Sequence, residues 1–212
     1  EDYEFNDFSS GTVGFGQKVS ASISRYGDLV SDIMMEVKLP AIEASATVTD
    51  ASGNTVADAD KAAYWVNAVG FALIQDLQVE IGGTEVDTLY PEWMFFWDEM
   101  TGRPGARLGE QIGKFEYSAD VEDDMIEFAS QARTLFVPLP LWFNKYFMEH
   151  GLSIPLIALT YHEIRVKVTF RPLSELCVVV YRDTDATHGE FWAQAEGKTP
   201  VNTATGSTLA TA

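Results

Sequence analysis

Apolar and polar residues alternate along much of the chain, as in a β-strand with one buried face. In GTVGFGQKVSASIS the apolar residues fall on odd positions from Val13 to Ile23, with serines and other polar residues between them. After the turn RYGD, the odd register resumes at Leu29 and continues to Leu39, where a proline follows. The two runs predict an antiparallel pair of strands joined by that turn.

The same alternation predicts further strands in YWVNAVGFALIQDLQVEIGG, TEVDTLY, RTLFVPLPLWF, TYHEIRVKVTF and ELCVVVY. Within the first of these, one face is predicted to carry Phe71, Leu73, Leu77, Val79 and Ile81. The glycine pair that follows, at 82 and 83, is typical of a two-residue hairpin turn, which requires positive φ at both positions.

One long segment is predicted to be a loop, and a second is predicted to be rich in loops. Residues 41–60 are small, polar and acidic, and offer nothing from which to build a core. Residues 103–132 contain the acidic run ADVEDDMIE. Pro138 and Pro140 place the strand RTLFVPLPLWF at an edge or a bulge, because proline cannot donate to a ladder.

The segment YPEWMFFWDEM at 90–100 predicts a short helix that begins at Pro91. Trp93, Phe96 and Trp97, followed by Met100, have the spacing of one helical face. We expect this face to pack into the core, in preference to forming an exposed sugar-binding platform. Phe95 and Met94 lie off that face, and we expect them to pack under loops or against another subunit.

Many strands, few helices and long loops indicate an all-β protein. Because strands do not alternate with regular helices, the pattern disfavours a βαβ winding. The predicted fold class is an antiparallel jelly-roll sandwich with short helices in the loops.

The net charge of the chain disfavours some classes of binding partner. The formal net charge is −18, and the 14 basic residues form no dense run, which disfavours direct binding of nucleic acid or of an anionic membrane. No apolar run reaches the roughly 18 residues of a membrane span. A single cysteine, Cys177, rules out an intrachain disulfide and fits maturation in a reducing compartment.

No catalytic, cofactor-binding or metal-binding residue is predicted. The three histidines, His150, His162 and His188, lack the spacing of zinc or cupin-type sites. His162 is placed in the strand TYHEIRVKVTF, where the adjacent Glu163 points to the other face. Cys177 is flanked by apolar residues and is expected to be buried and unreactive. The abundant carboxylates are interpreted as a solvated surface.

Three segments, in order, resemble one family. GTVGFGQKVSASISRYGDLVSDIMMEVKLP, YWVNAVGFALIQDLQVEIGGTEVDTLYPEWMFFWDEMT and LFVPLPLWFNKYFMEHGLSIPLIALTYHEIRVKVTFRPLSEL are similar to blocks of the double jelly-roll major capsid proteins of nucleocytoplasmic large DNA viruses. Together they span most of residues 11–176.

The resemblance implies a structural major capsid protein, with no enzymatic activity and no cofactor. It implies that residues 1–212 are the first half of a double jelly roll, truncated at both ends, with the second jelly roll absent. It also implies homotrimeric, pseudo-hexameric capsomers in an icosahedral shell, which contact neighbouring capsomers and minor capsid and penton proteins. Such a protein resides in the virion, is assembled in the host cytoplasm, and is separated from the genome by an internal membrane.

Two other interpretations predict different features. A lectin-like carbohydrate-binding jelly roll would be a self-contained sandwich with aromatic rings exposed in loops or on a concave face. A cupin-type metalloenzyme would bind a stoichiometric metal ion, which the histidine spacing disfavours.

Overall fold

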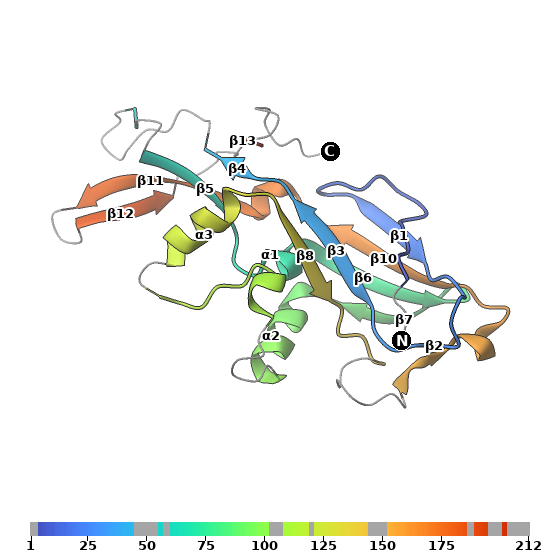
Figure 1. Cartoon of the computed structure of the whole chain (residues 1–212). Helices are drawn as coiled ribbons and strands as arrows, with labels where there is room; N and C mark the ends of the chain where they lie inside the picture. The colour runs from blue at the N-terminus through green and yellow to red at the C-terminus, as the bar shows by residue number, and fades with distance from the viewer. Residues whose placement is uncertain are drawn as a thin grey trace.

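Most of the regular secondary structure consists of antiparallel strands, and the helices are short (Figure 1). The computed structural model describes residues 4–44, 55–56, 60–101, 108–118, 121–143, 152–185, 189–194 and 201–202. All strand pairs among these residues are antiparallel. The predicted all-β class is confirmed.

One layer of the sandwich is a four-stranded sheet in the order β1-β10-β6-β7. Its strands are β1 (Lys18–Ser22), β10 (Ile164–Phe170), β6 (Ile74–Ile81) and β7 (Thr84–Leu89). In the central strand β10, the even-numbered residues from Ile164 to Phe170 are buried, while Arg165 and Lys167 lie on the outer face. The alternation read from the sequence therefore gives the correct inner and outer faces.

Shorter strand groups complete the sandwich. They are the pair β3 (Met34–Leu39) with β8 (Arg133–Pro138), the sheet β12-β11-β5 (Gly189–Gln194, Cys177–Asp185 and Lys61–Trp65), the pair β13 with β4 (Val201–Asn202 and Ile42–Glu43), and the pair β2 with β9 (Leu29–Val30 and Ile154–Pro155). Figure 1 shows β3 and β8 lying across the four-stranded sheet. One continuous core fills the space between the layers, with Met35, Leu135, Leu77 and Val168 among its members.

The predicted pairing of the two N-terminal runs is wrong. β1 pairs with β10, with Val19 opposite Val168, and β3 pairs with β8, with Val37 opposite Leu135. Both runs have one buried face, but they lie in different layers. Alternation reports which side of a strand is buried, and not which strand lies beside it.

The glycine hairpin is confirmed. Gly82 and Gly83 join β6 to β7 with φ of 60° and 84°, as a type I′ turn requires. The face predicted upstream of it is only partly correct. Leu77 and Val79 are fully buried in β6, whereas Phe71 lies in the helical turn α1 (Val69–Ala72).

Two segments predicted to be loops contribute to the core. Residues Val121–Ala129 form helix α3, which buries Met125, Phe128 and Ala129. These three residues have the spacing i, i+3 and i+4, and they follow an acidic first turn. Both features are typical of a helix, although the acidic composition of the segment suggested a loop. Ile42 is 2% exposed and belongs to β4, so the segment 41–60 is not entirely outside the core.

The edge position of RTLFVPLPLWF is confirmed for the part that forms a strand. Among the described strands β8 pairs only with β3, and the strand ends at Pro138.

Candidate interaction surfaces

Helix α2 spans Pro91–Thr101, as predicted, but its buried side differs from the predicted one. Met94 is fully buried, and Pro91 and Asp98 are also buried. Trp93, predicted to face the core, is 37% exposed. The helix packs on α1 and β6 through the narrow strip that contains Met94 and Asp98, so its wider aromatic face is left outside.

The orientation of α2 is fixed by a buried ion pair. Lys114 contacts the Asp98 carboxylate, and both side chains are 7% exposed. Its ammonium also lies 2.6 Å from Glu99 and 4.9 Å from the centre of the Phe95 ring. Burial alone would lower the pKa of Lys114, but the hydrogen bonds to Asp98 and Glu99 and their charges outweigh it and leave this pKa raised. Lys114 therefore stays charged and holds the helix.

A second ion pair fixes the beginning of the helix. Arg171 binds Glu92 at 2.8 Å and lies 3.6 Å from Glu175. Glu92 is in the first turn, where the helix dipole also favours a carboxylate. The ion pairs of Asp98 with Lys114 and of Glu92 with Arg171 therefore link α2 to the rest of the protein at two points.

The outward face of α2, together with Tyr90 immediately before the helix, forms a surface that we call the α2 ridge, defined as Tyr90, Trp93, Phe96 and Met100. Their exposed fractions are 55%, 37%, 53% and 56%. The Trp93 ring centre lies 6.3 Å from that of Phe96 and 5.6 Å from that of the half-buried Trp97, so the rings form one cluster. The predicted burial of Phe96 and Met100 is wrong, and Trp97 is only partly buried.

Phe95 is 39% exposed. This exposure supports the hypothesis that it contacts another subunit, although part of its ring already contacts Lys114.

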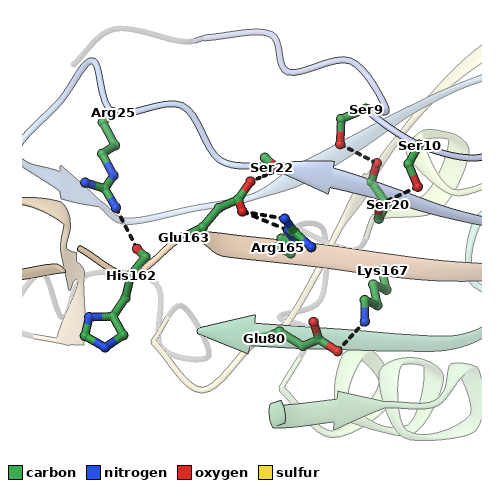
Figure 2. Close-up of polar contacts among 10 residues, drawn as sticks. All are labelled: Ser9, Ser10, Ser20, Ser22, Arg25, Glu80, His162, Glu163, Arg165 and Lys167. Carbon is green, nitrogen blue, oxygen red and sulfur yellow. Dashed lines mark hydrogen bonds and ion pairs between the residues drawn. The ribbon is translucent and has the colours of Figure 1, made fainter. Parts of the chain in front are cut away.

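The segments that carry the family resemblance meet at one corner of the four-stranded sheet (Figure 2). Arg25, from the first segment, donates hydrogen bonds to the backbone carbonyls of Thr160 and His162, from the third. Gly82, from the second, donates its N–H to the carbonyl of Glu163 at 2.9 Å. The corner therefore joins segments that are far apart in the sequence.

Glu163 is the centre of this corner. Its carboxylate accepts hydrogen bonds from Ser22 and Arg165, each at 2.6 Å. The hydrogen bond from Arg165, followed by that from Ser22, lowers the pKa of Glu163. The carboxylate is thus engaged in linking β1 to β10, which is a structural role.

The outer face of the sheet continues this polar pattern away from the corner. Lys167 on β10 pairs with Glu80 on β6, and Ser9 donates to the Ser20 carbonyl at 3.1 Å (Figure 2). Cross-strand contacts of this kind stabilise the register of neighbouring strands.

The close fit of Gly82 against His162 gives a first prediction. A Cβ at Gly82 would lie 2.4 Å from the His162 ring, whereas a Cβ at Gly83 would meet nothing within 4 Å. Both glycines have positive φ, so alanine is strained at either position. We expect Gly82→Ala to lower the free energy of unfolding by about 1–3 kcal/mol more than Gly83→Ala. Urea denaturation of both variants measures the difference, and equal losses would contradict the contact.

The residues considered for chemistry do not form a reactive site. His162 precedes β10, which begins at Ile164, so its placement within a strand is wrong. Cys177 is buried, its thiol donates to the Leu173 carbonyl at 3.2 Å, and burial raises its pKa to about 11, as expected of an unreactive thiol. His150 and His188 lie outside the described residues.

Neither a metal centre nor a membrane-spanning helix is found in the described part of the chain. It contains no group of three or more potential metal ligands. None of its helices is both long and apolar enough to cross a bilayer.

A shallow hollow of about 310 Å³ lies near the corner. Its lining is apolar apart from Ser153, and includes Ile81, Trp142, Ile154 and Leu159. Specific ligand sites usually combine an apolar wall with several convergent polar groups, and sugars require such groups in particular. The exposed rings of Trp93 and Phe96 lie on the outside of a helix, whereas the lectin-like interpretation predicts exposed rings in loops or on a concave face.

The protein is an antiparallel jelly roll. Its polar clusters link neighbouring strands, and helix α2 presents an exposed apolar face. These are features of a structural building block. The chain belongs to a family of viral capsid proteins, because the family model described as "Major capsid protein N-terminus" matches residues 2–211.

Relatives from several large DNA viruses support this assignment. The chain is 34% identical over 161 residues to the "Probable capsid protein 4" of Acanthamoeba polyphaga mimivirus, covering 76% of this chain and 29% of the relative. It is 33% identical over 180 residues to the "Major capsid protein" of Paramecium bursaria Chlorella virus 1, covering 85% and 34%. The chain therefore spans about a third of the length of these relatives.

Solved structures agree with the fold. The capsid of Paramecium bursaria Chlorella virus 1, in a quasi-atomic model, contains a chain that matches with a TM-score of 0.55 and 27% identity, covering 81% of this chain and 37% of that one. The Faustovirus major capsid protein matches with a TM-score of 0.64 over 93% of this chain and 51% of that one, and at 13% identity it supports the fold alone. These neighbours are double jelly-roll proteins, and the jelly-roll prediction is confirmed.

Proposed function

We propose that this chain is the N-terminal jelly roll of a major capsid protein, and that it builds the shell of a large icosahedral DNA virus. The observation that carries the proposal is the family match over residues 2–211. The role is structural and not enzymatic, which is consistent with the engagement of Glu163 and Cys177 in structural contacts.

In the proposed shell, the protein forms homotrimers with a pseudo-hexagonal outline. Each trimer contacts neighbouring capsomers and minor capsid and penton proteins. The protein resides in the virion after assembly in the host cytoplasm. With a net charge of −18, the chain is poorly suited to contact the genome directly.

No finding favours the carbohydrate-binding alternative. The family match and the named relatives all concern capsid proteins, and the apolar hollow offers few groups to bind a sugar.

Native mass spectrometry of the protein as isolated tests the proposed assembly. We expect a subunit heavier than the 23.4 kDa of this chain, present in complexes of three. A stable 23.4 kDa monomer would contradict the trimer and the double jelly roll together.

A further inference from the structure

Strand β1 is an edge strand of the four-stranded sheet, with β10 as its partner on one side. Just after β1, the Ile23 N–H donates to the Ile164 carbonyl at 3.0 Å. Successive residues of a strand direct their backbone groups to opposite sides, so Ser20, three residues earlier, directs its own away from β10. An open edge of this kind is a template for pairing with another chain.

Residues 5–11, which we call the strap, cover this edge at Ser20 (Figure 2). The Ser20 N–H donates to the Ser10 carbonyl at 3.0 Å, and the Ser20 carbonyl accepts from the Ser9 N–H at 2.8 Å. Ser10 and Ser20 form an isolated antiparallel bridge. The edge therefore accepts an antiparallel strand, and the strap occupies the position of that strand.

Two side chains of the strap fasten it to the sheet. The Asn6 carbonyl oxygen accepts hydrogen bonds from the N–H of Ser24, at 3.1 Å, and from its hydroxyl. The Phe8 ring packs edge-to-face with the Phe170 ring of β10, with 6.3 Å between the ring centres. Phe8 is half-buried and the other strap residues are exposed. A segment with so little buried apolar surface opens at a lower free energy than the sheet beneath it.

The strap ends at a glycine that lies directly against β1. Gly11 has a φ of 95°, a conformation that glycine adopts without strain. A Cβ at this position would lie 2.5 Å from the Lys18 carbonyl oxygen and 3.1 Å from the Val19 Cα. A larger residue at position 11 would therefore move the strap away from the edge.

The uncovered edge is compatible with a second copy of itself. A two-fold axis at Ser20 would pair two β1 strands antiparallel, with Lys18 of each copy opposite Ser22 of the other. Lys18 is the one charged residue of β1, so no like charges face each other in this register. Val19 would lie opposite Ala21, which are both small apolar residues.

We propose that the strap is a releasable cover of the β1 edge, and that the uncovered edge pairs with the β1 edge of a second copy. The closed strap keeps copies apart at this edge, so that other surfaces determine how they assemble. This device belongs to the fold of the chain and is independent of the proposed capsid role.

Hydrogen exchange at single-residue resolution tests the cover. In the full protein, Asn6→Ala with Phe8→Ala releases the strap, and Phe5→Ala is the matched control, because Phe5 is 82% exposed. We expect the Ser20 amide to exchange about tenfold faster, or more, in the released variant only. The Ile23 amide, which is bonded to β10, should exchange at the wild-type rate. An unchanged rate at Ser20 would overturn the proposal, because another part of the protein would then cover the edge.

Disulfide formation tests the pairing of copies. In the released variant, Ser20→Cys should give a disulfide-linked pair of copies under mild oxidation, and with the strap intact it should not. Ser22→Cys is the control, since the proposed register places its two copies roughly 13 Å apart along the strands. That separation is too long for a disulfide, which needs Cα atoms within about 7 Å. The natural Cys177 is buried.

Gly11→Ala releases the strap from its other end and should give the same two results. A released variant that forms no pair through position 20, or pairs equally through position 22, would overturn the pairing of β1 edges. Neither outcome bears on the capsid role, because native mass spectrometry of the wild-type protein tests that role with the strap in place.

Discussion

Replacing Met94 by alanine is expected to lower the free energy of unfolding by about 2–5 kcal/mol, the usual loss for a buried methionine. Phe96→Ala, two positions along the same helix, is expected to change it by less than about 0.5 kcal/mol. Met94 is 0% exposed and Phe96 is 53% exposed. Urea denaturation followed by far-ultraviolet circular dichroism measures both.

Two controls make the comparison specific. Met94→Leu keeps most of the side-chain volume and should cost less than about 1.5 kcal/mol, which shows that the loss in Met94→Ala reflects the cavity and not the helix. Phe5→Ala reports on an aromatic residue exposed elsewhere and should match Phe96→Ala. A larger loss from Phe96→Ala than from Met94→Ala would mean that the aromatic face is the buried one.

This contrast shows what helical periodicity reveals and what it does not. The spacing of Trp93, Phe96, Trp97 and Met100 correctly identified a helix and one apolar face. It did not reveal whether that face packs inside the subunit or against another molecule, because both require the same residues. The deciding feature is Met94, which lies on the opposite side and gave no periodic signal of its own.

In the sheets, too, periodicity in the sequence predicted only part of the structure. Period-two alternation placed Val19, Val166 and Val168 on inner faces, and the glycine pair located a hairpin, because both signals are local. Strand neighbours were not predictable, because the β1–β10 pairing joins residues about 150 apart, such as Val19 and Val168, and alternation is the same in every strand. The family resemblance identified the class of protein, but the role of its motifs as a corner that ties strands together became visible only in three dimensions.

The ion pair of Lys114 could not be predicted for the same reason. In the sequence, nothing distinguishes Asp98 from the many other acidic residues, and Lys114 lies in a segment predicted to be rich in loops. Only the contact of Lys114 with α2 in three dimensions shows that the Asp98 and Lys114 side chains, each 7% exposed, are buried together. The negative charge of the buried Asp98 carboxylate is therefore balanced by the positive charge of Lys114.

Lys114→Met is accordingly expected to lower the free energy of unfolding by about 3–5 kcal/mol, because it leaves a buried carboxylate without its cation. Glu99 is 40% exposed at its side chain and can turn to water, whereas Asp98 cannot. The double variant Lys114→Met with Asp98→Leu removes both charges and should recover most of the loss, since apolar replacement of a buried pair is often neutral. Chemical denaturation of the two variants and of Asp98→Leu completes a double-mutant cycle.

The pH dependence of the wild-type protein provides an independent check on the same pair. The pKa of Lys114 is raised in the folded state above its ordinary value of 10.5, so the folded protein holds this proton more tightly than the unfolded chain does. The stabilisation is therefore complete below pH 10.5 and is lost as the pH rises through the higher folded value. Lys114→Met lacks this proton, so the stability gap between wild type and variant should be constant from pH 7 to 10 and narrow above it. A gap that narrows already at neutral pH would show that Lys114 is not held as a cation by Asp98 and Glu99.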